Sequence, residues 1–148
     1  MKLFDELFKP AETHIASYSP FTVQEAYMAI FYSILHADED WGEKEFKALD
    51  AILMRLRVFE DENINFYIAE VKEQYLKYGA IPLINGGLHL ISQRLKPQLF
   101  CLCAELVLAN ESITHKEQKI LEYLADASNI SEELAQKIIE VTLLRMMN

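Results

Sequence analysis

Hydrophobic residues recur at helical spacing along most of the chain, beginning with residues 22–37. There the apolar positions fall at i, i+4, i+7 and i+11, on one face of a helix, and they are Val23, Tyr27, Ile30 and Ile34. Thr22 precedes this stripe as a candidate N-cap, and Glu25 stands three residues later, the spacing of a capping box. The pattern predicts an amphipathic helix with this face turned toward the core.

The same periodicity predicts further helices along the chain. A second helix is expected to bury Phe46, Leu49, Ile52, Leu53 and Leu56. A third covers about residues 61–78 and ends at Gly79, because glycine readily adopts the conformation that closes a helix. Residues 80–95 are expected to form a helix whose middle is weakened by Gly86 and Gly87.

The last third of the chain predicts three more helices. From Pro97 an almost wholly apolar helix is expected to run through the core with Leu99, Leu102, Cys103, Leu106 and Val107 buried. Thr114 and Glu117 form a second capping box that opens the next helix. Ser131 caps a last helix, whose expected core residues are Leu134, Ile138, Val141 and Leu144. With no strand signal of comparable length, the pattern predicts an all-α protein.

One helix–loop–helix pattern occurs twice, at an offset of 72 residues. In each copy an apolar helix ends at Ala, an Asp or Asn follows at once, and a Glu stands seven residues further on. These residues are Asp38 and Glu45 in the first copy and Asn110 and Glu117 in the second. We expect a single domain over residues 1–148, a bundle of about seven or eight helices built from two pseudo-symmetric repeats, about 22–78 and 97–147.

Composition agrees with that fold and narrows the function. The 148 residues are 51% hydrophobic with only 4 Gly and 4 Pro, too apolar for a disordered chain and too poor in turn residues for a many-stranded β protein. Asp and Glu number 23 against 14 Lys and Arg, a formal net charge of -9. That balance argues against a nucleic-acid binder or a polybasic membrane-surface protein, whereas cations or basic partners fit.

The cysteines and the apolar runs indicate a cytoplasmic protein. Cys101 and Cys103 stand two residues apart on a predicted helix, where side chains point to nearly opposite sides, so they should not form a disulfide. Two buried thiols suit a reducing cytosol. The first residues show no secretory signal, and the longest apolar runs are shorter than a bilayer span.

Several carboxylates follow the first predicted helix. Asp38, Asp40 and Glu45 offer hard oxygen donors of the kind that bind Ca²⁺, Mg²⁺ or Mn²⁺. The same acids also have a structural explanation, because Asp40 can cap the next helix and Glu45 stands where a capping-box acid reaches back. An EF-hand is excluded, since counting from Asp38 puts Glu43 where Gly is required and Leu49 where a bidentate Glu is required.

Zinc chemistry and catalysis have weaker signals. His36 lies near Asp38 and His115 near Glu117, which would make a transition-metal site if the two loops meet. Their spacing matches no zinc-binding helix motif, so zinc fits less well than the harder cations. Residues 85–87 lack the strand and the Lys of a phosphate-binding loop, and they are better explained by close helix packing or a bend. We therefore expect no enzyme.

The duplicated motif resembles the TerB-like domains, a family named for a tellurite-resistance protein and also found next to co-chaperone J-domains. The family's mark is an apolar helix that runs into Ala-x-Ala-Asp-Gly, then a Glu that opens the next helix, and both repeats carry versions of it. The resemblance implies an all-α, stress-associated module that binds a divalent cation through these acids. Asp38, Glu45 and Glu117 match the pattern. Glu39 replaces the family's Gly, and Asn110, a weaker ligand, replaces its second Asp.

Three functions follow as hypotheses. The first is a non-catalytic TerB-like module that acts in tellurite, metal or stress resistance and binds a divalent cation at Asp38, Asp40, Glu45 and Glu117. The second is a metal-free protein-interaction module whose acidic face recruits a basic partner. A weaker third is a metal-dependent hydrolase assembled across the repeats. A protein partner is expected, the oligomeric state is open with a homodimer as one option, and neither nucleic acid nor a membrane span is expected.

Overall fold

The computed structural model describes residues 17–36, 43–109 and 113–147. Within these ranges the chain forms seven α-helices and two short 3-10 helices, without any strand, which confirms the predicted all-α bundle. The α-helices are α2 (Val23–Leu35), α3 (Glu43–Arg55), α4 (Ile64–Tyr78), α5 (Ala80–Leu90), α6 (Lys96–Leu108), α7 (His115–Ala127) and α8 (Glu132–Met146). The 3-10 helices η1 (Arg57–Phe59) and η2 (Gln93–Leu95) precede α4 and α6.

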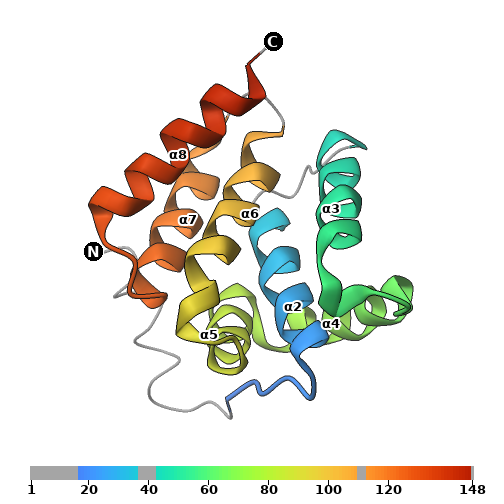
Figure 1. Ribbon diagram of the computed structural model, residues 1–148. Coiled ribbons are helices and arrows are strands. Elements are labelled where there is room, and N and C mark those ends of the chain that lie inside the picture. Colours follow the sequence, from blue (N-terminus) through green and yellow to red (C-terminus); the bar gives the residue numbers. More distant parts are fainter. Residues whose placement is uncertain (1–16, 37–42, 110–112, 148) are drawn as a thin grey trace.

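Helix α2 runs through the middle of the bundle. Figure 1 shows α3 on one side of it and α6 on the other, with α5 below, and α2 packs against α4, α5 and α6. Every residue from Glu25 to Leu35 is buried, so α2 is covered all round rather than along one stripe. The apolar helix α6 also lies in the core, as predicted, with Leu99, Cys103 and Leu106 fully buried. Val23 was predicted to face the core but is exposed, because it is the first residue of α2 and lies before the buried segment that begins at Glu25.

Local hydrogen bonds explain where several helices begin and end. The hydroxyl of Thr22 accepts a hydrogen bond from the Glu25 N–H at 3.1 Å, and Ser131 caps α8 in the same way. Gly79 ends α4 with a φ of 81°, a conformation that glycine adopts without strain. The Glu25 carboxylate, expected to complete a capping box, accepts a hydrogen bond from the buried Tyr18 hydroxyl at 2.6 Å. Thr22 therefore supplies the cap while Glu25 ties α2 to the preceding segment.

Two predicted helix boundaries were wrong by several residues. Helix α4 begins at Ile64 rather than near residue 61, because the Asn63 side chain caps it and Asp61 has a φ of 61°, outside the helical region. The helix expected over residues 80–95 ends at Leu90 and is followed by η2. Residues 91–95 thus connect α5 to α6 instead of extending α5.

Close packing of α5 on α2 depends on two glycines. A Cβ atom placed on Gly87 would lie 2.8 Å from the Ala26 carbonyl oxygen and 2.8 Å from Cγ1 of Ile30. A Cβ atom on Gly86 would collide with the backbone of Tyr18. The structure therefore confirms close helix packing as the explanation for residues 85–87, and α5 continues through them as a helix.

The predicted core stripes of the outer helices were partly wrong. In α3, Leu49, Ile52 and Leu53 are buried, but Phe46 is exposed. In α8, Leu134, Val141 and Leu144 are all exposed, whereas Thr142 is buried. Helix α8 packs mainly against α6 and α7, so only a narrow face of this helix is covered. An apolar residue on such an outer helix is not covered merely because it falls at helical spacing.

The helix bounds fit the predicted duplication. Helices α3 and α7 have equal lengths, and it is 72 residues from Glu43 to His115 and likewise from Arg55 to Ala127. Helices α2 and α6, which precede them, are both 13 residues long and are offset by 73 residues, one more than the predicted 72. That agreement concerns lengths and spacing, and the pseudo-symmetry of the two halves in space stays a prediction. In the described part of the chain, no helix is both long and apolar enough to span a bilayer.

Candidate functional site

Glu117 belongs to the capping box that the sequence predicted. Its Oε1 accepts a hydrogen bond from the Thr114 N–H at 2.9 Å, and the Thr114 hydroxyl accepts one from the Glu117 N–H at 3.1 Å. This arrangement satisfies two N–H groups at the start of α7 that the helix itself leaves without partners. The carboxylate is 5% exposed. One oxygen of Glu117 is therefore engaged in a structural role.

Glu45 occupies the matching position in the first copy of the motif. It lies in the first turn of α3 and is 2% exposed, so both Glu45 and Glu117 are buried carboxylates near a helix N-terminus. The helix dipole favours negative charge at this position. The other two predicted ligands, Asp38 and Asp40, lie outside the described residues. The structure thus describes two of the four predicted ligands, Glu45 and Glu117. That the four carboxylates come together in one site stays a prediction.

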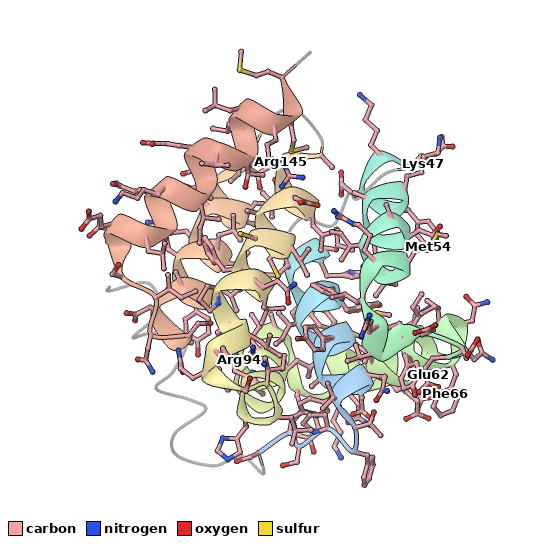
Figure 2. The ribbon with its side chains drawn as sticks, in the orientation of Figure 1. Lys47, Met54, Glu62, Phe66, Arg94 and Arg145 are labelled. Carbon is pink, nitrogen blue, oxygen red and sulfur yellow. The ribbon has the colours of Figure 1, made fainter. Side chains whose placement is uncertain are left out.

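The remaining acidic residues of that region form a solvated face. These exposed carboxylates are Glu43, Asp50, Glu60, Asp61 and Glu62. Among the described residues, no group of three or more His, Cys, Asp and Glu side chains is close enough to hold a metal ion. Figure 2 shows Glu62 beside the exposed Phe66 at the outer end of α4.

The histidines differ sharply in their surroundings. His36, which follows α2, is partly buried and stacks on Tyr32, with ring centroids 4.2 Å apart and ring planes inclined by 21°. Its ring centroid also lies 5.3 Å from that of Tyr75. Burial lowers the pKa of His36, and the charge of Lys72 lowers it further. His115, by contrast, is exposed at the start of α7.

Both cysteines are free thiols in the described structure, as predicted. Cys103 is fully buried, and burial raises its pKa well above the ordinary range. Cys101, expected to be buried, is only partly so. Burial raises the pKa of Cys101, the charge of Glu105 raises it further, and the charge of Arg145 opposes both. Neither thiol has the depressed pKa of a reactive cysteine.

An apolar surface on α8 was missed by the sequence analysis, which assigned its residues to the core. Leu134 is 41% exposed, Val141 53% and Leu144 68%. They stand at i, i+7 and i+10, so they form one stripe along the helix, which we call the α8 stripe. Figure 1 shows α8 at the edge of the bundle. The signal available in the sequence was the same helical periodicity, which cannot distinguish a core face from a face that binds a partner.

Comparisons with known proteins add no further assignment: no protein-family model matches the sequence, and no curated protein or solved structure matches it.

Proposed function

We propose that the chain is a non-catalytic helical interaction module that recruits a basic partner without a metal. The observation that carries the proposal is the α8 stripe, Leu134, Val141 and Leu144, exposed along an edge helix. Apolar side chains arranged along one face of a helix provide the contacts used when two helices pack together. Exposed apolar patches on soluble proteins commonly mark interaction sites.

The charges around the α8 stripe favour a basic partner. Helix α8 exposes three carboxylates, Glu132, Glu133 and Glu140, against two cations. Lys137 is paired with Glu133 at 3.2 Å, and Arg145 lies 3.7 Å from Glu105 of α6, so each cation already faces a carboxylate. The whole chain carries a formal charge of -9. A partner helix with an apolar face and flanking Lys or Arg residues would therefore match both the stripe and its surroundings.

Two synthetic peptides test this pairing. Both would carry the same apolar helical face, one flanked by Lys and Arg and the other by Glu. We expect the full chain to bind the basic peptide and not the acidic one, with affinity that falls as salt is added, because salt screens exposed charges. Fluorescence anisotropy of labelled peptides gives both affinities. Equal binding of the two peptides would contradict the proposed partner chemistry.

Variants locate the contact on α8. The double variant Val141→Ser/Leu144→Ser should weaken binding of the basic peptide at least tenfold, because it removes two of the three apolar side chains of the stripe. Leu76→Ser is a matched control, since Leu76 is 78% exposed on α4, away from α8. Light scattering coupled to size exclusion is run on all three proteins. A dimer that the double variant dissociates would show that a second copy covers the stripe, and would overturn the basic-partner proposal.

Divalent-cation binding is a second candidate, supported by the burial of Glu45, which is 2% exposed and follows Asp38 and Asp40 closely in the sequence. Low local polarity strengthens the attraction between a carboxylate and a bound cation. This candidate also carries the role in tellurite, metal or stress resistance that the resemblance to TerB-like domains implies.

Thermal unfolding of EDTA-stripped protein tests whether the chain binds a divalent cation. If Ca²⁺, Mg²⁺, Mn²⁺ or Zn²⁺ binds the folded state, it should raise Tm, and a ligand at about 100 times its Kd adds about 2.7 kcal/mol to folding. Glu45→Gln should abolish the shift. Glu117→Gln tests the second repeat while preserving the cap, because a Gln oxygen can also accept the Thr114 hydrogen bond. No shift with any of the four cations would exclude the candidate.

A further inference from the structure

A pocket of about 210 Å³, which we call the cavity and which is open to solvent on one side, lies where α3, α6 and α8 meet. Much of its wall consists of small or apolar side chains, Ala48 and Ala51 from α3, Ala109 after α6 and Met146 from α8. The hydroxyl of Thr142, which also lines it, donates to the Ile138 carbonyl oxygen at 2.7 Å and so is already engaged within α8. The apolar wall offers room for a compact hydrophobic group.

Three charged side chains from three helices converge on this cavity. Nη2 of Arg55 donates to Oε2 of Glu105 at 2.7 Å, while Nη1 of Arg145 lies 3.7 Å from Oε1 of the same carboxylate. Each oxygen of Glu105 therefore faces one guanidinium. Figure 2 shows Arg145 near the upper ends of α6 and α8. Because a guanidinium carries five N–H donors, one shared carboxylate does not exhaust the two arginines.

The charge of this cluster is opposite to that of the molecule. Two guanidinium groups and one carboxylate leave one net positive charge at the cavity, in a chain whose formal charge is -9. One additional negative charge would neutralise the cluster. A carboxylate meets that need, and its planar geometry suits paired hydrogen bonds from arginine.

We propose that the cavity binds a free small carboxylate with a compact apolar body. The carboxylate would accept hydrogen bonds from Arg55 and Arg145 in competition with Glu105, and the apolar body would contact Ala48 and Met146. Benzoate is a probe of suitable size, because an enclosed cavity of about 150 Å³ in another protein accommodates benzene and this pocket of about 210 Å³ opens to solvent beside the exposed guanidinium groups of Arg55 and Arg145. The inference is independent of the α8 stripe, because it concerns a small anion and not a basic peptide.

Titration of the full chain with sodium benzoate, followed by ¹H–¹⁵N NMR, tests the proposal. Benzamide is the matched control, since it has the same shape and no charge. Benzoate should shift the amide signals of Ala48, Ala51 and Ala109 in a saturable manner, and benzamide should bind at least tenfold more weakly. Equal responses to the two compounds would overturn the proposal, as would no saturable response to benzoate.

Four variants separate a binding site from a purely structural ion cluster. Arg55→Gln and Arg145→Gln should each weaken benzoate binding at least fivefold, whereas Arg57→Gln, an exposed arginine on η1, should leave it unchanged. Glu105→Gln should strengthen binding severalfold, because it removes the carboxylate that competes with the ligand for the same donors. Circular dichroism and thermal unfolding establish that each variant is folded. If folded Glu105→Gln binds benzoate no better than the unaltered chain, Glu105 does not compete with a ligand and the proposal fails.

Discussion

At the residue scale, His36 links burial to the pH dependence of folding. Burial and the charge of Lys72 both lower its pKa from the ordinary value of 6.5. Below that value the unfolded chain takes up a proton that the folded chain resists, so the free energy of unfolding rises with pH in this window. The contribution of neutral, buried His36 to the free energy of unfolding is fully present above about pH 6.5, and it is lost as the pH falls toward the lowered pKa.

Replacing His36 with phenylalanine tests this linkage. The phenyl ring is not titratable and can still pack on Tyr32, so the variant should lose less stability than the unaltered chain between about pH 7 and about pH 5. Urea unfolding at several pH values gives the comparison. His89→Phe, at an exposed position of α5, is the control and should keep the original pH dependence. Parallel pH curves for the unaltered chain and His36→Phe would contradict the assignment.

The two thiols should differ in reactivity. The thiolate is the reactive form, so the raised pKa of both groups slows modification, and full burial protects Cys103 further. At about pH 8 a thiol reagent should modify Cys101 slowly and Cys103 only after unfolding. Mass spectrometry of timed samples, with Cys101→Ser as control, measures this order. Modification of Cys103 in the folded chain at the rate of Cys101 would show that α6 is less well covered than the structure indicates.

At the scale of the element, Gly87 controls how closely α5 approaches α2. Gly87→Ala would gain about 1 kcal/mol of helix propensity but would force its methyl group against the Ala26 carbonyl and Ile30, and overpacking costs about 1–3 kcal/mol. Because one of the contacts is backbone, which cannot rotate away, we expect a net loss of stability of about 1–2 kcal/mol. Denaturant unfolding measures it. His89→Ala, on an exposed face of the same helix, should be neutral or slightly stabilising, and a stabilised Gly87→Ala would contradict the packing argument.

Helix ends were predictable from the sequence because their causes are local. Thr22, Thr114 and Ser131 each cap a helix by accepting from an N–H three residues later, and Gly79 ends α4. Burial was less predictable, because it depends on which helices become neighbours. The same helical spacing gives a fully enclosed α2 and an α8 whose stripe faces outward.

The candidate sites show the same contrast between features with local causes and features that depend on the fold. The capping box that holds Glu117 was visible as a four-residue pattern, and the structure confirms it. Arg55, Glu105 and Arg145 come from three helices and share no short motif, so only the fold brings them to one cavity. No spacing rule connects residues 50 positions apart in a helical bundle.

At the scale of the whole molecule, α2 joins the two predicted repeats into one core. It packs against α4 from its own repeat, against α6 from the other and against α5 between them. We expect the chain to unfold in a single cooperative transition, because unfolding of the second repeat would expose the side of α2 that α6 covers. Far- and near-ultraviolet circular dichroism in urea should give the same midpoint. Two separated transitions would show instead that the repeats are independent folding units.

The enclosure of α2 also has a consequence during synthesis of the chain. Leu35 ends α2, and α6, which covers one of its sides, is complete only at Leu108, 73 residues later. At about 5–20 residues per second, translation needs roughly 4 to 15 s to cover that interval. For those seconds an apolar helix made for the centre of the protein has no complete covering. The segment from Glu25 to Leu35 is thus the part of the nascent chain that we expect a chaperone to hold, and the part where stalled synthesis would start aggregation.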